Sequence, residues 1–225
     1  MNKFTHYLII AAAASQLTAC QTLTESRPER NTTQAERIDA AIENAAISAA
    51  NKGSASASLL ALEKQYKRNP ENPSYAIAYS KGLRQAQFLN RAKMVLEPFA
   101  KEEPAFAGVQ TEMSMIALAL GNYNSAENYA QKAVLQDPED YKAYQNLGIA
   151  LDAKEMHPEA ERAFRKGLEH WQGDPTTIMN NLALNLATQG FIDEAVEVLE
   201  RAQALSPDRI EIERNLRIIR TLNER

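Results

Sequence analysis

Three asparagines in the second half of the 225-residue chain stand at nearly constant intervals. Asn146, Asn181 and Asn215 are each followed directly by leucine. A carboxamide carries both N–H donors and an acceptor oxygen, so it can pair with the backbone of an extended peptide whatever that peptide's sequence. If the amides lie in register, they would form a ladder that holds such a peptide. The alternative is that all of them simply face water.

The single cysteine, Cys20, closes the segment Leu17-Thr18-Ala19-Cys20. Lys3 and the short apolar stretch from Tyr7 to Ala14 precede this segment, which is the pattern of a secretory signal peptide. The segment resembles the bacterial lipobox, in which the cysteine sulfur takes a diacylglyceryl group before cleavage. The resemblance implies a lipoprotein signal peptide over residues 1–19 and a lipid anchor to the membrane on Cys20.

The residues after Cys20 are expected to form a flexible tether, so that residues 20–32 comprise the lipidated cysteine and this tether. Gln21 to Thr32 is polar and has no apolar period. Residue 21 is Gln rather than Asp, which resembles the outer-membrane address of lipoproteins in enterobacteria-like sorting. Thr33-Gln34-Ala35-Glu36 fits a capping box and predicts that the first helix begins there.

The sequence has no pattern typical of catalysis or of metal binding. His157 and His170 lack a ligand partner at helical spacing, so we expect both to be surface histidines. The motifs GxxxxGK[ST], GxGxxG and GxSxG are absent. A net charge of −4, with cations scattered among acids, favours no nucleic-acid partner. We therefore expect a protein that is not an enzyme, with no cofactor, no metal and no small-molecule substrate.

A constant interval organises the rest of the chain. Intervals of 34 residues separate members of two sets, Pro70, Pro104 and Pro138 on the one hand and Ala92, Ala126 and Ala160 on the other. This is the period of the tetratricopeptide helix-turn-helix unit. The period predicts an all-α fold, a right-handed α-solenoid of about five such repeats plus a C-terminal capping helix. The predicted domain covers residues 33–225, with repeats at 39–72, 73–106, 107–140, 141–175 and 176–209 and the cap at 210–222.

Local signals refine this frame. Gly121 and Gly190 fall at the fifteenth position of their units, where the first helix must stop and φ can be positive. The fourth unit is one residue long, and we expect the extra residue in the turn Trp171-Gln172-Gly173. Asp137-Pro138, Asp174-Pro175 and Ser206-Pro207 place a capping side chain before a proline, which predicts that helices begin at these prolines.

Stacked units of this kind present their first helices along a concave groove, which is where we expect a protein partner to bind. Besides the three asparagines, further residues fall at predicted groove positions: Gln145, Asn180, Lys81, Arg84 and Met115. Met115 fits the core equally well. If the ladder binds a peptide, replacing Asn146, Asn181 and Asn215 by Ala should abolish capture while leaving the melting temperature nearly unchanged.

The C-terminal units carry a more specific resemblance. The run from Asn180 to Ala187 (NNLALNLA), the segment Asp193-Glu194-Ala195 and the closing Arg214-Asn215-Leu216 are similar to the tetratricopeptide lipoprotein of the tight-adherence (Tad/Flp) pilus system, the TadD-like family. The resemblance implies a pilotin-like assembly factor on the periplasmic face of the outer membrane. Its groove would capture a segment of the secretin or of another pilus-assembly component.

Two other functions remain open at this point. One is an adaptor lipoprotein that scaffolds peptidoglycan or outer-membrane biogenesis enzymes. The other is a type IV pilus pilotin, which has the same architecture with differently spaced repeats. Gene neighbourhood would separate them, since adjacent secretin, prepilin peptidase and secretion-ATPase genes favour the tight-adherence pilus.

Overall fold

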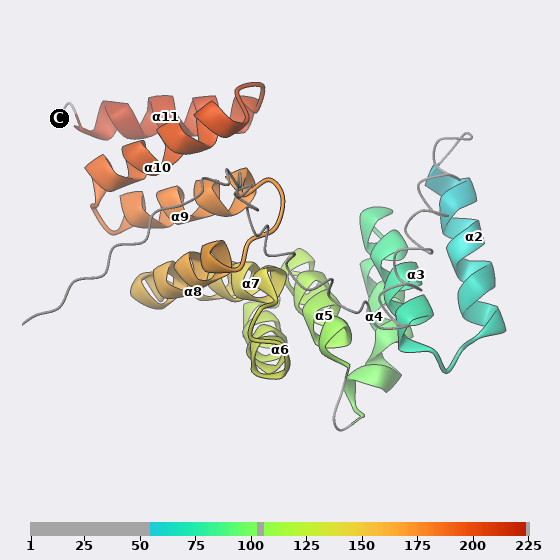
Figure 1. Cartoon of the computed structure of the whole chain (residues 1–225). Coiled ribbons are helices and arrows are strands. Elements are labelled where there is room, and N and C mark those ends of the chain that lie inside the picture. Colours follow the sequence, from blue (N-terminus) through green and yellow to red (C-terminus); the bar gives the residue numbers. More distant parts are fainter. Residues whose placement is uncertain (1–54, 103–105, 224–225) are drawn as a thin grey trace, which may run out of the picture. The chain divides into compact units, whose positions relative to one another are not determined.

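The computed structural model describes residues 55–102 and 106–223, and this part of the chain is entirely helical. Cys20, the predicted tether, the capping box at Thr33 and the predicted first helix of the unit 39–72 lie outside the described residues. Figure 1 shows the helices in chain order. Their bounds are α2 Ala55–Arg68, α3 Pro73–Gln85, α4 Leu89–Ala100, α5 Ala107–Ala119, α6 Tyr123–Gln136, α7 Tyr141–Asp152, α8 His157–Glu169, α9 Thr176–Thr188, α10 Ile192–Leu205 and α11 Ile210–Asn223.

The helices alternate between two roles. The odd-numbered helices α3 to α11, called first helices below, begin at residues 73, 107, 141, 176 and 210. Each of them packs on the helix that precedes it in the chain, and neighbouring first helices also contact one another, so each unit buries part of the surface of its neighbours. The interval between the starts of α7 and α9 is 35 residues, and the connection between α8 and α9 spans residues 170–175. The all-α solenoid predicted from the period is confirmed.

Small side chains let paired helices approach closely. The even-numbered helices α4, α6, α8 and α10, called second helices below, each have alanine as their fourth residue. These residues are Ala92, Ala126, Ala160 and Ala195, and none of them is exposed to solvent. In α7, a Cβ added to Gly148 would lie 2.5 Å from Cε1 of the Phe164 ring in α8. Real Cβ atoms do not approach other atoms so closely, so only glycine leaves room for that ring.

The turn inside each unit needs one residue with positive φ. Gly121 (φ 71°) and Gly190 (φ 87°) supply it in two units, as predicted from their position. Gln87 (φ 65°) and Glu155 (φ 62°) hold the equivalent position in the other two. A side chain in this left-handed region costs free energy that glycine avoids, so these two turns are strained.

Two helix starts differ from the prediction. α11 begins at Ile210, three residues after Pro207. α7 begins at Tyr141, three residues after Pro138, and its N-cap is Asp140. The Asp140 carboxylate accepts hydrogen bonds from the backbone N–H groups of Lys142 (2.9 Å) and Ala143 (3.1 Å). A carboxylate that caps two backbone groups sets the start of a helix more strongly than proline, which only tolerates that place.

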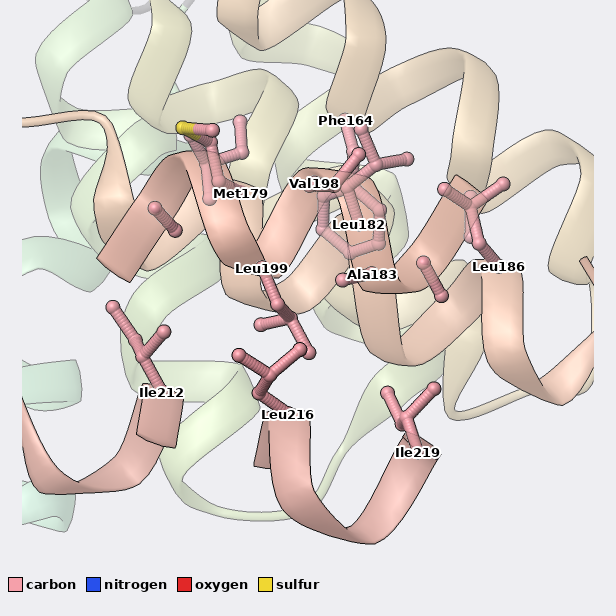
Figure 2. Packing of buried hydrophobic residues seen from close by; sticks show 14 of the residues in the cluster. Phe164, Met179, Leu182, Ala183, Leu186, Val198, Leu199, Ile212, Leu216 and Ile219 are labelled. Carbon is pink, nitrogen blue, oxygen red and sulfur yellow. The ribbon is translucent and has the colours of Figure 1, made fainter. Parts of the chain in front are cut away.

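The apolar core runs along the solenoid as separate clusters. The C-terminal cluster, drawn in Figure 2, contains Phe164 of α8, Leu182 and Leu186 of α9 and Leu199 of α10, and all of them are almost fully buried. α11 adds Ile212, Leu216 and Ile219 to the same cluster. A second cluster joins α2 to α5, and a small cluster built largely of alanine lies between α5, α6 and α7.

Candidate functional site: the face of the first helices

The predicted binding residues fall on one side of the array, which we call the first-helix face. It is formed by the fifth, sixth and ninth residues of the first helices. Its members are Ile77, Ala78 and Lys81 in α3, Thr111, Glu112 and Met115 in α5, Gln145, Asn146 and Ile149 in α7, Asn180, Asn181 and Leu184 in α9, and Arg214, Asn215 and Ile218 in α11. Arg84, the remaining candidate, is the twelfth residue of α3. The helix register thus places the candidates in rows across neighbouring helices.

Asn146 is a structural residue in this arrangement. Its side chain is 4% exposed. Its Nδ2 donates to the backbone oxygen of Thr111 (3.3 Å) and to Oγ of Ser114 (2.6 Å), both in α5. Because both N–H donors are used inside the protein, Asn146 joins α5 to α7 and has no donor left for a peptide. Replacing it by Ala should therefore lower stability, contrary to the expectation from sequence.

The amides farther along the array are placed differently. Asn215 donates from Nδ2 to Oδ1 of Asn180 at 2.8 Å, so its partner is the fifth residue of α9 rather than the sixth. Asn181 is half-buried and forms no side-chain hydrogen bond with other described residues. Gln145 is half-buried in α7. The three asparagines share a position in their helices, but they do not form a ladder of equivalent groups.

Arg84 is committed to a buried ion pair. Its Nε and Nη2 groups donate to the two oxygens of Glu112 at 2.7 and 3.2 Å, which links α3 to α5. Glu112 is only 5% exposed, and burial raises the pKa of its carboxyl, while Arg84 and, more weakly, Lys81 act to lower it. The Arg84 guanidinium is therefore part of the scaffold. If it paired with a ligand instead, the Glu112 carboxylate would remain buried without a partner. Lys81 itself is half-buried.

An apolar row on the same face was missed from the sequence. The ninth residues of α5, α7, α9 and α11 are all apolar, and two of them, Leu184 (38%) and Ile218 (53%), are well exposed. Leu222, one turn after Ile218, is 49% exposed. Met115 and Ile149 in the same row are half-buried. The signal was present in the sequence, because these residues repeat at the same interval as the asparagines.

The histidines are less exposed than predicted. His157 Nδ1 lies 2.8 Å from Oδ1 of Asp152, and the imidazole is 26% exposed. The same aspartate oxygen accepts from Nδ2 of the buried Asn185 at 2.7 Å, so the group ties α7, α8 and α9 together. His170 stacks on Tyr144 with ring centroids 6.2 Å apart. Within residues 55–102 and 106–223, no cluster of His, Cys, Asp or Glu could hold a metal ion.

The described helices have 12 to 14 residues each. None of those in residues 55–102 and 106–223 has the length and apolar character that crossing a bilayer requires.

Comparison with known proteins identifies the repeat. Two family models described as tetratricopeptide repeat match the chain, at residues 107–140 and 176–205. A sequence comparison with curated proteins gives no significant match.

Solved structures share the architecture at low sequence identity. A protein from Thermus thermophilus, TTC0263, is described as a thermophilic TPR protein; it is 17% identical over 80% of this chain and 98% of its own, with a TM-score of 0.67. MamA from Desulfovibrio magneticus is 19% identical over 76% of this chain and 97% of its own, with a TM-score of 0.59. YrrB, described as a TPR protein with an unusual peptide-binding site, is 18% identical over 82% of this chain and 91% of its own, with a TM-score of 0.55. The chain therefore folds as a tetratricopeptide-repeat α-solenoid, a scaffold that generally serves protein–protein interaction rather than catalysis.

Proposed function

We propose that the protein is a lipid-anchored assembly factor that acts on the periplasmic face of the outer membrane. The observation that carries the proposal is the order of two features in one chain. Leu17-Thr18-Ala19-Cys20 has the form of a lipoprotein processing site, and it precedes a solenoid of protein-binding repeats. Two or more acyl chains on Cys20 would give stable anchoring, since each buried CH₂ contributes about 0.8 kcal/mol.

The partner that we propose is a segment of the secretin of a tight-adherence (Tad/Flp) pilus or of a related secretion machine. The resemblance of the segments around Asn180 and Asn215 to the lipoprotein of that system supports this choice. In a pilotin-like role the protein performs no chemistry. The anchor fixes the site of capture, and the raised local concentration of the captured segment then favours assembly of the ring.

The test is crosslinking in the cell followed by purification of the chain under denaturing conditions. We expect the secretin or another pilus component in the crosslinked product of the wild-type chain. With Cys20→Ser, we expect the protein to leave the outer-membrane fraction and the number of assembled secretin rings to fall. Recovery of cell-wall hydrolases without any secretin would refute the pilus role and support the adaptor function instead.

A matched control separates location from fold. The melting temperature of the Cys20→Ser chain should equal that of the wild type, because the described helices of the solenoid begin at Ala55. If Cys20→Ser remained in the outer-membrane fraction with full activity, the lipid anchor would play no part in the function.

A further inference from the structure

Apolar exposure along the ninth-residue row rises toward the C-terminal end of the solenoid. The row begins with Lys81 in α3 and continues with the half-buried Met115 and Ile149. Leu184 in α9 is 38% exposed, and Ile218 in α11 is 53% exposed. The first-helix face thus ends in an apolar surface on α9 and α11 that contains Leu184, Ile218 and Leu222, called the C-terminal patch below.

The place of α11 as the last described helix does not explain this patch. In α7 the eighth residue, Gly148, packs against the Phe164 ring of α8, and the eleventh residue, Leu151, is buried. In α11 the corresponding residues are Arg217 and Arg220, each of which forms an ion pair. The side of α11 on which another helix would pack is therefore adapted to water, whereas its first-helix face keeps exposed apolar residues. Exposed apolar side chains that gather on one face of a helix indicate an interaction surface.

The side chains of the patch itself argue against an extended peptide. Leu184, Ile218 and Leu222 are apolar and offer no hydrogen-bonding group. The backbone N–H and C=O groups of an extended strand lying directly over them would find no partner there. A helix satisfies its own backbone groups and can offer a continuous apolar stripe. The patch is therefore suited to a helical partner.

Charge complementarity defines the partner further. Arg214 is exposed on α11, one turn before Ile218, and it forms no ion pair or hydrogen bond within residues 55–102 and 106–223. Other arginines of α11 are paired, which sets Arg214 apart. A carboxylate on the partner would complete this site.

The spacing of the patch also fits a helix. Packed helix axes are about 8–10 Å apart, which sets the approximate separation of Leu184 from Ile218 on neighbouring first helices. Residues seven apart on an α-helix lie about 10.5 Å apart on the same face. One apolar residue per seven in the partner can therefore meet α9 and α11 in turn.

We propose that the C-terminal patch binds an amphipathic helix of the partner protein, with apolar residues about seven apart and an acidic residue that pairs with Arg214. The inference rests on the proposed protein-binding function and specifies which face is used and which kind of segment it takes.

Fluorescence anisotropy with the full chain tests this inference. The probes are labelled synthetic peptides of about 20 residues that carry leucine on one helical face and glutamate beside it. A second peptide has lysine for each glutamate, and a third has proline inside the helix. We expect the acidic helix to bind at least about tenfold more tightly than either of the others. Arg214→Glu should reverse the preference between the acidic and basic peptides.

Substitutions at exposed apolar sites locate the binding. Leu184→Glu and Ile218→Glu should each weaken binding of the acidic peptide at least about tenfold, and Leu135→Glu, at an 81% exposed site on α6, should leave it unchanged. Circular dichroism on each variant checks that the fold is intact. Failure of the acidic peptide to bind, equal binding of all peptides, or loss of binding with Leu135→Glu alone would overturn the inference. If the peptides behave as expected while the secretin is not crosslinked, the proposed pilus function is refuted and the inference about the C-terminal patch is supported. If the secretin is crosslinked while the acidic peptide does not bind, the pilus function is supported and the inference about the patch is refuted.

Discussion

The N-terminal and C-terminal parts of the first-helix face use the same helix positions for different purposes. Between α3 and α7, two polar side chains at these positions are buried and bonded within the protein: Glu112 pairs with Arg84, and Asn146 donates to Ser114. Between α9 and α11, the same side carries exposed apolar residues and amides near the surface. Position within a repeat therefore does not by itself tell whether a side chain is part of the scaffold or available to a partner.

The sixth position shows the contrast within a single row. Glu112 and Asn146 are 5% and 4% exposed, whereas Asn181 and Asn215 are half-buried. A buried polar group that loses its hydrogen-bond partner costs free energy. The hydrogen bonds of Glu112 and Asn146 therefore contribute to the stability of the fold. Substitutions in the N-terminal part of the face should therefore lower stability, whereas substitutions in its C-terminal part should leave stability nearly unchanged.

The largest effect is expected from Arg84→Met. The substitution leaves the Glu112 carboxylate buried without its partner, which should lower the free energy of unfolding by about 3–5 kcal/mol at neutral pH. Urea unfolding followed by circular dichroism measures this loss. Replacing both residues, as in Arg84→Met with Glu112→Leu, should restore most of the stability, because no charge is then buried. A double variant as unstable as Arg84→Met would contradict the assignment.

The same substitution should change how stability depends on pH. Burial raises the pKa of Glu112, so the folded protein binds this proton more tightly than the unfolded chain does. The stabilisation from that proton is full below the ordinary pKa of glutamate and is lost as the pH rises through the folded-state pKa. Arg84 acts to lower this pKa, so its removal should extend the loss to higher pH. The cost of Arg84→Met should therefore be smallest in acid and grow toward neutral pH.

The next effect concerns the packing between α7 and α8. An added Cβ in Gly148→Ala would lie 2.5 and 2.6 Å from Cε1 and Cδ1 of Phe164, a nearly fully buried ring with little room to move. We expect a loss of about 1–3 kcal/mol in the free energy of unfolding. In α3, the Cβ added by Gly82→Ala meets the flexible ends of Leu62 (2.9 Å) and Leu59 (3.2 Å), so this substitution should cost less. Equal losses for both variants would mean that the Phe164 ring adapts freely.

A smaller effect should distinguish two asparagines at the same helix position. Asn146→Ala removes both hydrogen bonds to α5 and leaves the buried Thr111 oxygen without this donor, so it should cost about 1–3 kcal/mol. Asn181→Ala removes no hydrogen bond to a described residue and should change stability by less than about 0.5 kcal/mol. Thermal unfolding of the two variants checks the difference. If Asn146→Ala melted with the wild type, the buried network would not matter for stability.

Much of the fold could be predicted because the residues that recur with the period are those at which neighbouring helices contact each other. Ala126 and Gly148 are small for reasons of close approach, and such requirements recur in every unit. What could not be predicted is local. The positive φ of Gln87 and Glu155 is imposed by the equivalent turn, although neither residue favours it. The start of α7 depends on Asp140, whose capping competes with the proline signal at Pro138.

The candidate site was less predictable, since exposure depends on the neighbours of each residue. Asn146 is buried because Ser114 of the preceding first helix can accept its amide, while Asn215 meets Asn180 instead. A period in the sequence predicts the row but gives no information on these partners. The apolar row could have been found from the same spacing, because Leu184 and Ile218 stand 34 residues apart. It was overlooked because an apolar residue in a helix is usually assigned to the core.

The smallest effect should be a gain in stability, shared by a turn in the N-terminal part and a turn at the centre. Gln87→Gly and Glu155→Gly relieve a side chain held at positive φ in turns where Gly121 and Gly190 do the same task without strain. Each should raise the free energy of unfolding by about 0.5–1 kcal/mol, less than the full strain because glycine makes the unfolded chain more flexible. For a chain of this size the melting temperature should rise by about 1–4 °C per substitution.

Gly121→Ala is the matched control: no atom lies within 4 Å of the added Cβ, so its loss of stability measures the backbone strain alone. If Gln87→Gly lowered the melting temperature while Gly121→Ala also lowered it, contacts of the Gln87 side chain would outweigh its strain, and the two turns would not be equivalent.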